Sequence, residues 1–275
     1  MSGVTRPILR FHGGKFKLAD WIISHFPVHR IYVEPYGGAA SVLLSKERSY
    51  QDVYNDLDGE LVNLFRVARD RGPELLHVLE LTPYSRDEFR LSYERSEDDL
   101  ERARRVVVRS FMGHGSNSHN RLTGFRRHSR ASGTSPCGDW RNLPEAFAQI
   151  IERLRGVVIE CRDALGLIAE QDSTDTLFYL DPPYVASTRD KGADYRFELT
   201  DNDHRLLACA MRGARGMVAI SGYRSDLYDD VFAGWVRSDR LTRADGARAR
   251  VESLWMNPAL TDRLELERAQ GRLIA

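Results

Sequence analysis

The segment TLFYLDPPY, residues 176–184, joins an unbroken apolar run to an acid, two prolines and a tyrosine. The apolar run predicts a β-strand, and the two prolines that follow stiffen the backbone and remove two N–H donors. In open α/β sheets, ligands bind beyond the carboxyl ends of the strands. We therefore expect the chemistry of this chain at Asp181, directly after the strand.

The tetrapeptide after this strand offers hydrogen-bond acceptors and an aromatic ring. The Asp181 carboxylate and the Pro182 carbonyl can each accept an N–H group, and the Tyr184 ring can stack on a heterocycle. Such a site suits a planar amine. Asp181, Pro182, Pro183 and Tyr184 are therefore candidate catalytic residues. The alternative is an ordinary proline turn with Tyr184 in the core.

Strands and helices alternate in the N-terminal part. Ile31–Glu34 and Gln51–Asn55 have the composition of strands. Residues 39–46 and 58–71 have the pattern of helices, the second with Asp58 as N-cap. This alternation predicts a parallel sheet with crossover helices.

The alternation then stops and later returns. Residues 75–109 are charged and mostly helical in pattern, whereas residues 113–142 indicate loop or irregular β structure. Further strands are expected at residues 157–161, 176–180 and 217–221, and an antiparallel hairpin at residues 235–241 and 250–256 around a turn at 244–246. We predict one α/β core, residues 1–74 and 156–275, with an inserted module at residues 75–155.

A second candidate site is EPYGGAAS, residues 34–41, between a strand and a helix. Small residues let the backbone approach a ligand closely at a helix N-terminus. The segment lacks the GxGxxG pattern of dinucleotide sites. Asp56 follows Gly38 by 18 residues, close to the spacing of roughly 20 at which an acid commonly binds ribose hydroxyls. The two features together indicate a nucleoside-bearing cofactor; a tight strand–helix turn is the alternative for the loop alone.

A third candidate is FHGGK, residues 11–15, in which two glycines precede a lysine. The glycines allow close backbone approach and the lysine supplies a cation. Taken alone, the segment also suits a flexible N-terminal turn with a surface lysine.

The composition is that of an ordinary globular chain. Forty basic and forty acidic residues cancel, so an argument for nucleic acid must be local. Cys137, Cys161 and Cys209 lack metal-ligand spacing, which speaks against a zinc site and a disulfide framework and fits a reducing cytoplasm. A signal peptide and a membrane span are not indicated. We expect a cytoplasmic protein without a metal.

Taken in order, the glycine-lysine segment, the EPYGG loop, the acid of the YND segment, the interruption and DPPY resemble the Dam-like (D12 class) DNA adenine-N6 methyltransferases. The resemblance runs from about Arg10 to Asn257, and RSFMG (109–113), TGFR (123–126), SGY (221–223) and ESLW (252–255) support it. The chain is similar to phage and prophage members. The resemblance implies a Rossmann-like S-adenosylmethionine-dependent methyltransferase sheet with an inserted, mostly helical target-recognition module.

The resemblance also implies S-adenosyl-L-methionine as cofactor, S-adenosyl-L-homocysteine as product, and no metal. Phe11 stands where the family often has tryptophan or tyrosine, and Ala40 where glycine is common; neither change removes a group that the reaction needs. The cofactor-binding residues that it implies are Phe11, Gly13, Gly14, Lys15, Glu34, Pro35, Tyr36, Gly37, Gly38, Ala39, Ala40, Ser41, Asn55, Asp56, Asp163 and Asp181.

The implied reaction is methylation of adenine N6, a poor nucleophile because its lone pair is delocalised into the ring. Hydrogen bonds to Asp181 and the Pro182 carbonyl would favour a tetrahedral amine that attacks the sulfonium methyl, and would stabilise the charge on nitrogen. Because the amine is hidden in duplex DNA, the base would be flipped out and stacked on Tyr184.

A basic segment is the candidate DNA-binding surface. Residues 109–141 contain six arginines and one acid, Asp139, and Lys or Arg side chains supply the contacts to phosphates. The alternative is a solvated loop with excess charge. The candidate DNA-binding residues are Arg109, Asn117, Arg121, Arg126, Arg127 and Arg130.

Other readings of the sequence stay open at this point. The same fold can methylate cytosine N4 or RNA, or can survive as a non-catalytic DNA-binding relative. A nicotinamide dehydrogenase is disfavoured by the missing GxGxxG pattern. The expected partner is double-stranded DNA, with a cognate restriction endonuclease as a further candidate, no membrane, a monomeric state and association with the nucleoid during action on DNA.

Overall fold

The computed structural model describes residues 3–11, 13–115, 121–127, 135–189, 195–243 and 249–271. The chain forms two compact units. The first unit contains residues 1–20, 38–47 and 58–161, and the second contains residues 21–37, 48–57 and 162–275. The chain passes from the first unit to the second within helix α1 (Ala19–Ile23), after residue 20.

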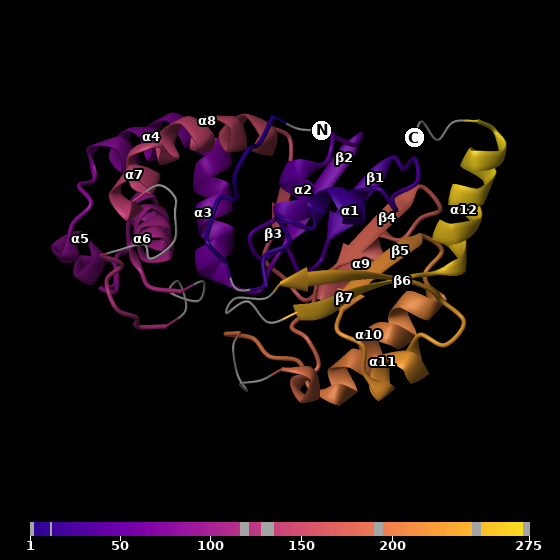
Figure 1. The fold of residues 1–275 in the computed structure, drawn as a ribbon. Coiled ribbons are helices and arrows are strands. Elements are labelled where there is room, and N and C mark those ends of the chain that lie inside the picture. The colour runs from indigo at the N-terminus through magenta and orange to yellow at the C-terminus, as the bar shows by residue number, and fades with distance from the viewer. Residues whose placement is uncertain are drawn as a thin grey trace. The chain divides into compact units, whose positions relative to one another are not determined.

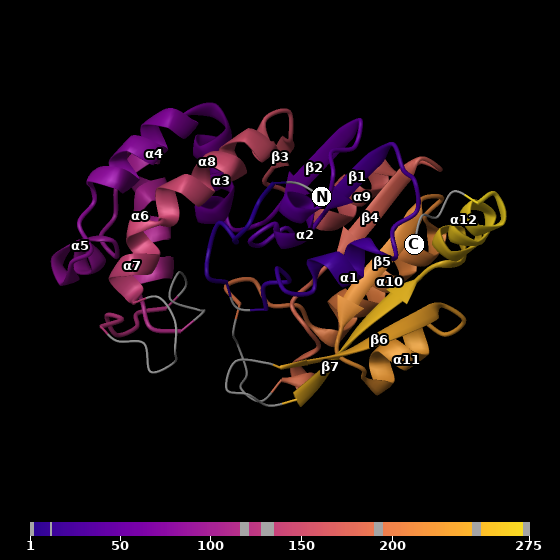
Figure 2. The same ribbon diagram turned by 45° about the horizontal axis from the view of Figure 1, so that its top comes forward.

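The second unit carries a mixed sheet with the strand order β2-β1-β4-β5-β7-β6 (Figures 1 and 2). The strands β2, β1, β4 and β5 are parallel, whereas β7 is antiparallel to both β5 and β6. Their bounds are β1 (Ile31–Glu34), β2 (Gln51–Asn55), β4 (Thr176–Leu180), β5 (Met217–Gly222), β6 (Val236–Arg243) and β7 (Ala249–Met256).

An apolar core covers one face of this sheet. Val33 pairs with Val53 on β2 and with Phe178 on β4, and these side chains are fully buried. Helices α9 (Ala164–Gln171), α10 (Asp201–Gly213) and α11 (Asp226–Val231) supply the opposing residues of the same core. The central strands β4 and β5 are buried along their whole length, as in parallel sheets that are covered by helices.

Two further elements complete the second unit. The 3₁₀ turn η1 (Ala186–Thr188) follows the DPPY segment. Helix α12 (Pro258–Ala269) contacts β5. It begins where the Asn257 side chain accepts the backbone N–H of Leu260 at 3.0 Å, an N-cap that satisfies one of the donors left open at a helix start.

The first unit is mainly helical. Helix α6 packs against α3, α4, α5 and α7, and helix α8 packs against α2, α3, α4 and α7. The elements are α2 (Ser41–Ser45), α3 (Gly59–Asp70), α4 (Gly72–Leu81), α5 (Arg86–Leu91), α6 (Asp99–Met112), α7 (Pro136–Arg141), α8 (Leu143–Leu154) and β3 (Val158–Glu160).

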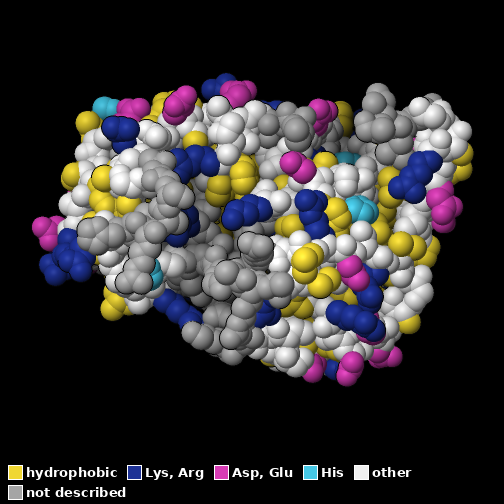
Figure 3. Space-filling model, viewed as in Figure 1, with side chains coloured by type: hydrophobic (Ala, Val, Ile, Leu, Met, Phe, Trp, Pro, Cys, Tyr) yellow, Lys and Arg dark blue, Asp and Glu magenta, His cyan; other side chains and the backbone are white. Residues whose placement is uncertain are grey.

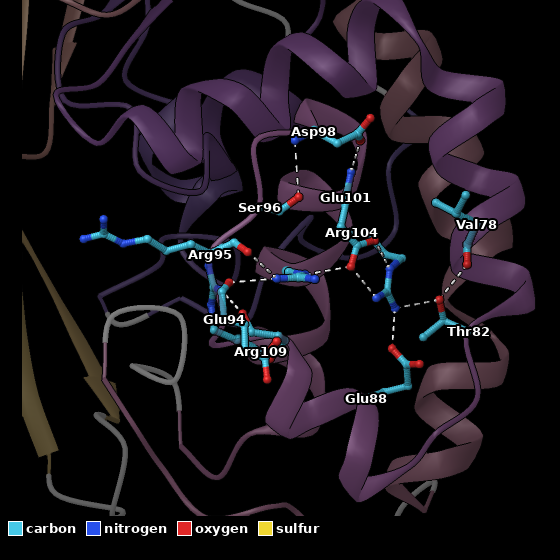
Figure 4. Close-up of polar contacts among 12 residues, drawn as sticks. Val78, Thr82, Glu88, Glu94, Arg95, Ser96, Asp98, Glu101, Arg104 and Arg109 are labelled. Atoms are coloured by element: carbon cyan, nitrogen blue, oxygen red, sulfur yellow. Dashed lines mark hydrogen bonds and ion pairs between the residues drawn. The ribbon is translucent and has the colours of Figure 1, made fainter.

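A set of arginines on α6 ties the helices of the first unit together (Figure 4). Arg104 donates two hydrogen bonds of 2.7 Å to Glu101, one of 2.6 Å to Glu88 on α5, and one of 3.1 Å to the Thr82 hydroxyl after α4. Arg105 donates at 2.7 Å to Oε1 of Glu101, the oxygen that also accepts a hydrogen bond from Arg104. The bidentate pair with Glu101 fixes the Arg104 guanidinium on α6, and its single bonds to Glu88 and Thr82 join α6 to α5 and to the end of α4.

The predicted α/β class and the parallel sheet with its antiparallel hairpin are confirmed. The prediction of loop or irregular β structure was wrong for residues 136–141, which form α7. Ser135 caps this helix by accepting the N–H of Gly138 at 3.2 Å, and Trp140 anchors it through a 2.8 Å hydrogen bond to the Thr82 carbonyl. The turn expected at residues 244–246 lies outside the described residues.

The bounds of the predicted domains stay a prediction. The expected insert, residues 75–155, falls within the first unit, which also includes α3. Helix α3 contacts α4, α6 and α8 of that unit.

Candidate active site

The two main candidate segments follow neighbouring parallel strands. The segment from Pro35 begins where β1 ends, and the segment from Asp181 begins where β4 ends; β1 and β4 are paired in parallel. The chain leaves β1 for β2 on one side, whereas β4 lies on the other side. Such a reversal of strand order opens a crevice at the carboxyl ends of the strands, which is where open α/β sheets bind ligands.

Tyr184 is buried, and hydrogen bonding fixes its ring. Its hydroxyl donates a hydrogen bond to the carboxylate of Glu252 on β7. The ring lies edge-to-face with Tyr223, with 4.7 Å between the centroids and 77° between the planes. Asp181, at the start of the segment, is half-buried. The structure therefore places an acid and a fixed aromatic ring in one short segment.

The Tyr184 hydroxyl keeps its proton. Burial raises the pKa of Tyr184 well above its ordinary value, and the negative charges of Asp181 and Glu252 raise it further. A phenol with a raised pKa is a hydrogen-bond donor and a poor general base near neutral pH. Tyr184 can therefore contribute its ring, but not a phenolate.

Asn55 connects the loop after β1 to the segment before α9. Its side-chain amide donates to the carbonyls of Pro35 at 2.9 Å and Arg162 at 3.0 Å, and its side-chain oxygen accepts the N–H of Arg162 at 3.0 Å. Gly37 donates its N–H to the Asn55 carbonyl at 2.7 Å. The predicted cofactor residue Asn55 thus holds the loop in place through its side chain.

Glycine is required at position 37 because the Tyr54 ring lies close to the backbone there. A Cβ at this position would lie 2.2 Å from the Tyr54 ring, which is far inside van der Waals contact. The predicted cofactor loop therefore has no room for a side chain at its first glycine.

Three predicted acids of the second unit differ in their surroundings. Glu34 is buried and accepts the Tyr32 hydroxyl at 2.6 Å. Asp163 is exposed and caps α9 by accepting the N–H of Gly166 at 2.8 Å. Asp56 is half-buried directly after β2. Asp163 is therefore exposed to solvent and Asp56 partly so, whereas Glu34 is buried inside the unit.

The first unit holds the other predicted cofactor residues. The Phe11 ring packs on Gly38, since a Cβ there would lie 3.0 Å from it, and Gly38 has a φ of +49°. Gly14 donates its N–H to the Phe11 carbonyl at 3.2 Å. Lys15 is buried, and its ammonium donates to the Gly13 carbonyl at 2.7 Å. The glycine-lysine segment is therefore an ordered turn that contacts the glycine loop.

Ala40 adopts a backbone conformation that favours glycine. Its φ of 51° and ψ of 34° are left-handed, and it is the one non-glycine residue with positive φ among those described. The left-handed region costs an L-residue about 1–2 kcal/mol. Glycine is common at this position in the resembled family, and the backbone of Ala40 has the conformation that glycine adopts most easily.

We expect Ala40→Val to lower the free energy of unfolding by about 1–3 kcal/mol, because a β-branched residue tolerates positive φ poorly and Ala40 is buried. Ala40→Gly should leave this free energy unchanged or raise it by up to about 1 kcal/mol. Urea denaturation of the three proteins measures both changes. A valine variant as stable as the wild type would contradict the left-handed assignment.

The predicted DNA-binding arginines lie in different surroundings. Arg109 donates to the Ser92 carbonyl, lies 4.0 Å from Glu60, and sits over the Tyr93 ring. Arg126 pairs with Asp139 at 3.1 Å. These contacts stabilise the first unit, so DNA binding by Arg109 and Arg126 stays a prediction.

Arg121 and Arg127 are exposed, whereas Asn117 and Arg130 lie outside the described residues. Figure 3 shows positive side chains interspersed with negative ones over the helices of this unit. Of the predicted arginines with a described position, Arg121 and Arg127 are therefore the ones whose side chains solvent, and a phosphate, can reach.

Sequence reasoning gave no individual role to Glu252, Tyr223 and Arg250. The guanidinium of Arg250 lies 5.1 Å from the centre of the Tyr223 ring and donates to the Thr188 carbonyl at 3.3 Å. The stretches SGY and ESLW resemble the family, but their contact with Tyr184 depends on the pairing of β5 with β7.

Two further properties concern the described ranges as a whole. His, Cys, Asp and Glu side chains in these ranges do not gather in a group of three or more that could hold a metal ion. Within the same ranges, every helix is too short or too polar to cross a bilayer.

Comparison with known proteins gives a consistent result. Residues 11–236 match the family described as D12 class N6 adenine-specific DNA methyltransferase. The chain is similar to the DNA adenine methylase of Escherichia coli strain K12, with 26% identity over 191 residues, which is 66% of each chain. The DNA adenine methylase of Salmonella typhi is 27% identical over 188 residues, 66% of each chain. That of Serratia marcescens is 27% identical over 190 residues, 66% of this chain and 67% of the relative.

Proposed function

The chain belongs to the D12 class N6 adenine-specific DNA methyltransferase family, and from this premise we propose that it methylates the N6 amine of adenine in double-stranded DNA. The match to the Escherichia coli relative spans 66% of that protein. The activity is therefore argued from the residues of this chain in the following paragraphs.

The observation that carries the proposal is the position of Asp181 and Tyr184. They follow β4 at the reversal of strand order, beside the loop that follows β1. Pro182 and Pro183 lack N–H groups, so the segment offers acceptors where an amine needs them. An exocyclic amine with two N–H groups is the complement of a carboxylate and a carbonyl.

Each residue of this segment then has a definite task. The Asp181 carboxylate and the Pro182 carbonyl accept the two N–H groups of the target amine and stabilise the positive charge that builds on its nitrogen. The Tyr184 ring stacks on a base that has left the duplex. Since the Tyr184 hydroxyl keeps its proton and donates to Glu252, Asp181 is the acceptor that serves the amine.

The methyl donor that we propose is S-adenosyl-L-methionine, which when bound supplies an electrophilic methyl group. The donor set fits such a nucleoside. Asp163 is exposed to solvent and Asp56 partly so, and carboxylates are the usual acceptors for ribose hydroxyls and an exocyclic amine. Gly38, with positive φ, has no side chain beside the Phe11 ring. The Phe11 ring offers an apolar surface to a ligand.

The experiment that tests the function is methyl transfer from labelled S-adenosylmethionine to unmethylated genomic DNA, followed by nucleoside analysis. We expect N6-methyladenine as the labelled product. Labelled N4-methylcytosine, or transfer to RNA alone, would overturn the choice of substrate, and cofactor binding without transfer would overturn the catalytic assignment. Sequencing that detects the modified base then gives the recognition site.

We further propose that Arg121 and Arg127 contact DNA phosphates. We expect the double variant Arg121→Gln, Arg127→Gln to bind DNA about tenfold to a hundredfold more weakly at low salt. The slope of log affinity against log salt should fall by about 2, because each lost phosphate contact removes about 0.9. Titrations at several salt concentrations measure both quantities.

Arg90→Gln is a matched control, because Arg90 is exposed in the same unit and pairs with Asp87 on α5. An unchanged salt slope in the double variant would contradict the assignment. A cognate restriction endonuclease as partner, a monomeric state and association with the nucleoid stay predictions.

A further inference from the structure

Glu252 is a buried acid next to the proposed catalytic segment. Its side chain lies on β7, is 3% exposed, and accepts the Tyr184 hydroxyl. Taking a carboxylate out of water is costly unless hydrogen bonds compensate for it. Further along β7 lie the buried apolar residues Leu254, Trp255 and Met256. Packing alone would therefore favour an apolar residue at position 252.

The pairing of the strands places Glu252 where it is. On β5 and β7, Ser221 pairs with Leu254 and Gly222 with Ser253. Continuing this antiparallel register by one residue brings Tyr223 opposite Glu252. The strand pairing therefore aligns the acid with the residue whose ring contacts Tyr184.

A second set of contacts holds the ring from another direction. Tyr223 lies edge-to-face against Tyr184. Arg250 lies over the Tyr223 ring and donates to the Thr188 carbonyl on η1. Arg250 and Glu252 are two residues apart on one strand, so their side chains leave the same face of the sheet. The ring of Tyr184 is thus restrained at its hydroxyl by a carboxylate and at its side by an aromatic neighbour.

We propose that Glu252 is a positioning residue that fixes the ring of Tyr184 for stacking on the flipped adenine. This inference rests on the proposed function. Because the Glu252 carboxylate accepts the Tyr184 hydroxyl, the ring of Tyr184 is oriented before the base arrives. Pre-orientation of this kind acts on the rate within the complex, and a misplacement of about 1 Å can cost about 10²-fold in rate.

The first test is kinetic. We expect Glu252→Ala to lower kcat by about 10²-fold and to leave the Kd for S-adenosylmethionine within about threefold. Glu252→Gln retains an acceptor oxygen of the same size and should recover most of the loss. Tyr184→Phe removes the same hydrogen bond from the other side, so the double variant Tyr184→Phe, Glu252→Ala should be no slower than the slower single variant.

Glu267→Ala is the control for loss of a buried acid. Glu267 is 6% exposed in the same unit and accepts the Val28 N–H at 2.9 Å, far along the chain from the DPPY segment. It should cost stability without lowering kcat. Losses that multiply in the double variant, or an equal loss of kcat in Glu267→Ala, would overturn the inference.

A second measurement follows the ring itself. DNA with 2-aminopurine at the target adenine reports base stacking by fluorescence, and NMR of labelled tyrosine reports ring rotation. We expect Glu252→Ala to change the fluorescence of the bound DNA and to speed rotation of the Tyr184 ring. Wild-type methylation with unchanged ring and fluorescence in Glu252→Ala would overturn the positioning role alone. Failure of the wild type to methylate DNA would overturn the proposed function and, with it, the catalytic meaning of this contact.

Discussion

Replacement of Asp181 by asparagine is expected to lower kcat for methyl transfer by about 10³-fold, the magnitude associated with removing one preorganised electrostatic group from a reacting centre. Asparagine preserves size and shape but replaces an acceptor-only carboxylate with a group that also carries N–H donors. Those donors would face the N–H groups of the target amine. Single-turnover kinetics with labelled cofactor measures the rate, and a binding titration should show DNA affinity within about twofold of the wild type.

Asp226→Asn is the matched control for this prediction, because Asp226 is an exposed acid in the first turn of α11. It should retain wild-type turnover. If Asp181→Asn also kept most of its turnover, the carboxylate would not be the acceptor that serves the amine. If it lost turnover only in proportion to DNA binding, Asp181 would hold the substrate without stabilising the reaction.

The second large effect concerns stability. We expect Arg104→Ala to lower the free energy of unfolding by about 2–3 kcal/mol, because it removes the bidentate pair with Glu101 and the single hydrogen bond to Glu88. Both acids retain about a quarter of their side-chain exposure, so the loss is smaller than for a fully buried pair. The melting temperature should fall by about 5–10 °C for a chain of this size.

The loss of stability in Arg104→Ala should depend on pH in a definite direction. The hydrogen bond from Arg104, together with that from Arg105, lowers the pKa of Glu101 below its ordinary value. A lowered carboxyl pKa stabilises the folded state above the unfolded pKa of about 4.3, and the contribution is lost as the pH falls below it. The difference between wild type and Arg104→Ala should therefore be largest near neutral pH and shrink in acid.

The exposed Arg95 of the same unit offers a control (Figure 4). Its carbonyl accepts Arg105 at 3.2 Å, a contact that Arg95→Ala preserves. This variant should melt within about 2 °C of the wild type. An equal fall in both variants would mean that the network contributes no more than an ordinary surface arginine.

The sequence was most informative where chemical pattern and local structure coincide. The run TLFYL forms β4, and the run QDVYN forms β2 with the bounds expected. Asp58 caps α3 as its side-chain chemistry predicts. In each case the deciding interactions lie within a few residues, so a single sequence carries them.

The failures have the opposite cause. Helix α7 was missed because PCGDWR has too few apolar residues for a periodic pattern, and its anchor is the hydrogen bond from Trp140 to the distant Thr82. The contact of Tyr184 with Glu252 spans 68 positions and depends on the antiparallel register of β7. The basic segment likewise gave no sign that the Arg109 guanidinium donates to the Ser92 carbonyl, and DNA binding by Arg109 stays a prediction.

The division into two units has a consequence for biosynthesis. The chain passes from one unit to the other after residues 20, 37, 47, 57 and 161. A ribosome therefore releases β1 and β2 before the whole of residues 58–161, and β1 receives its neighbour β4 only afterwards. Until then β1 has an open strand edge, which is where chains associate with one another. Slow translation of residues 58–161 should therefore reduce the yield of native protein while leaving the specific activity of the folded fraction unchanged.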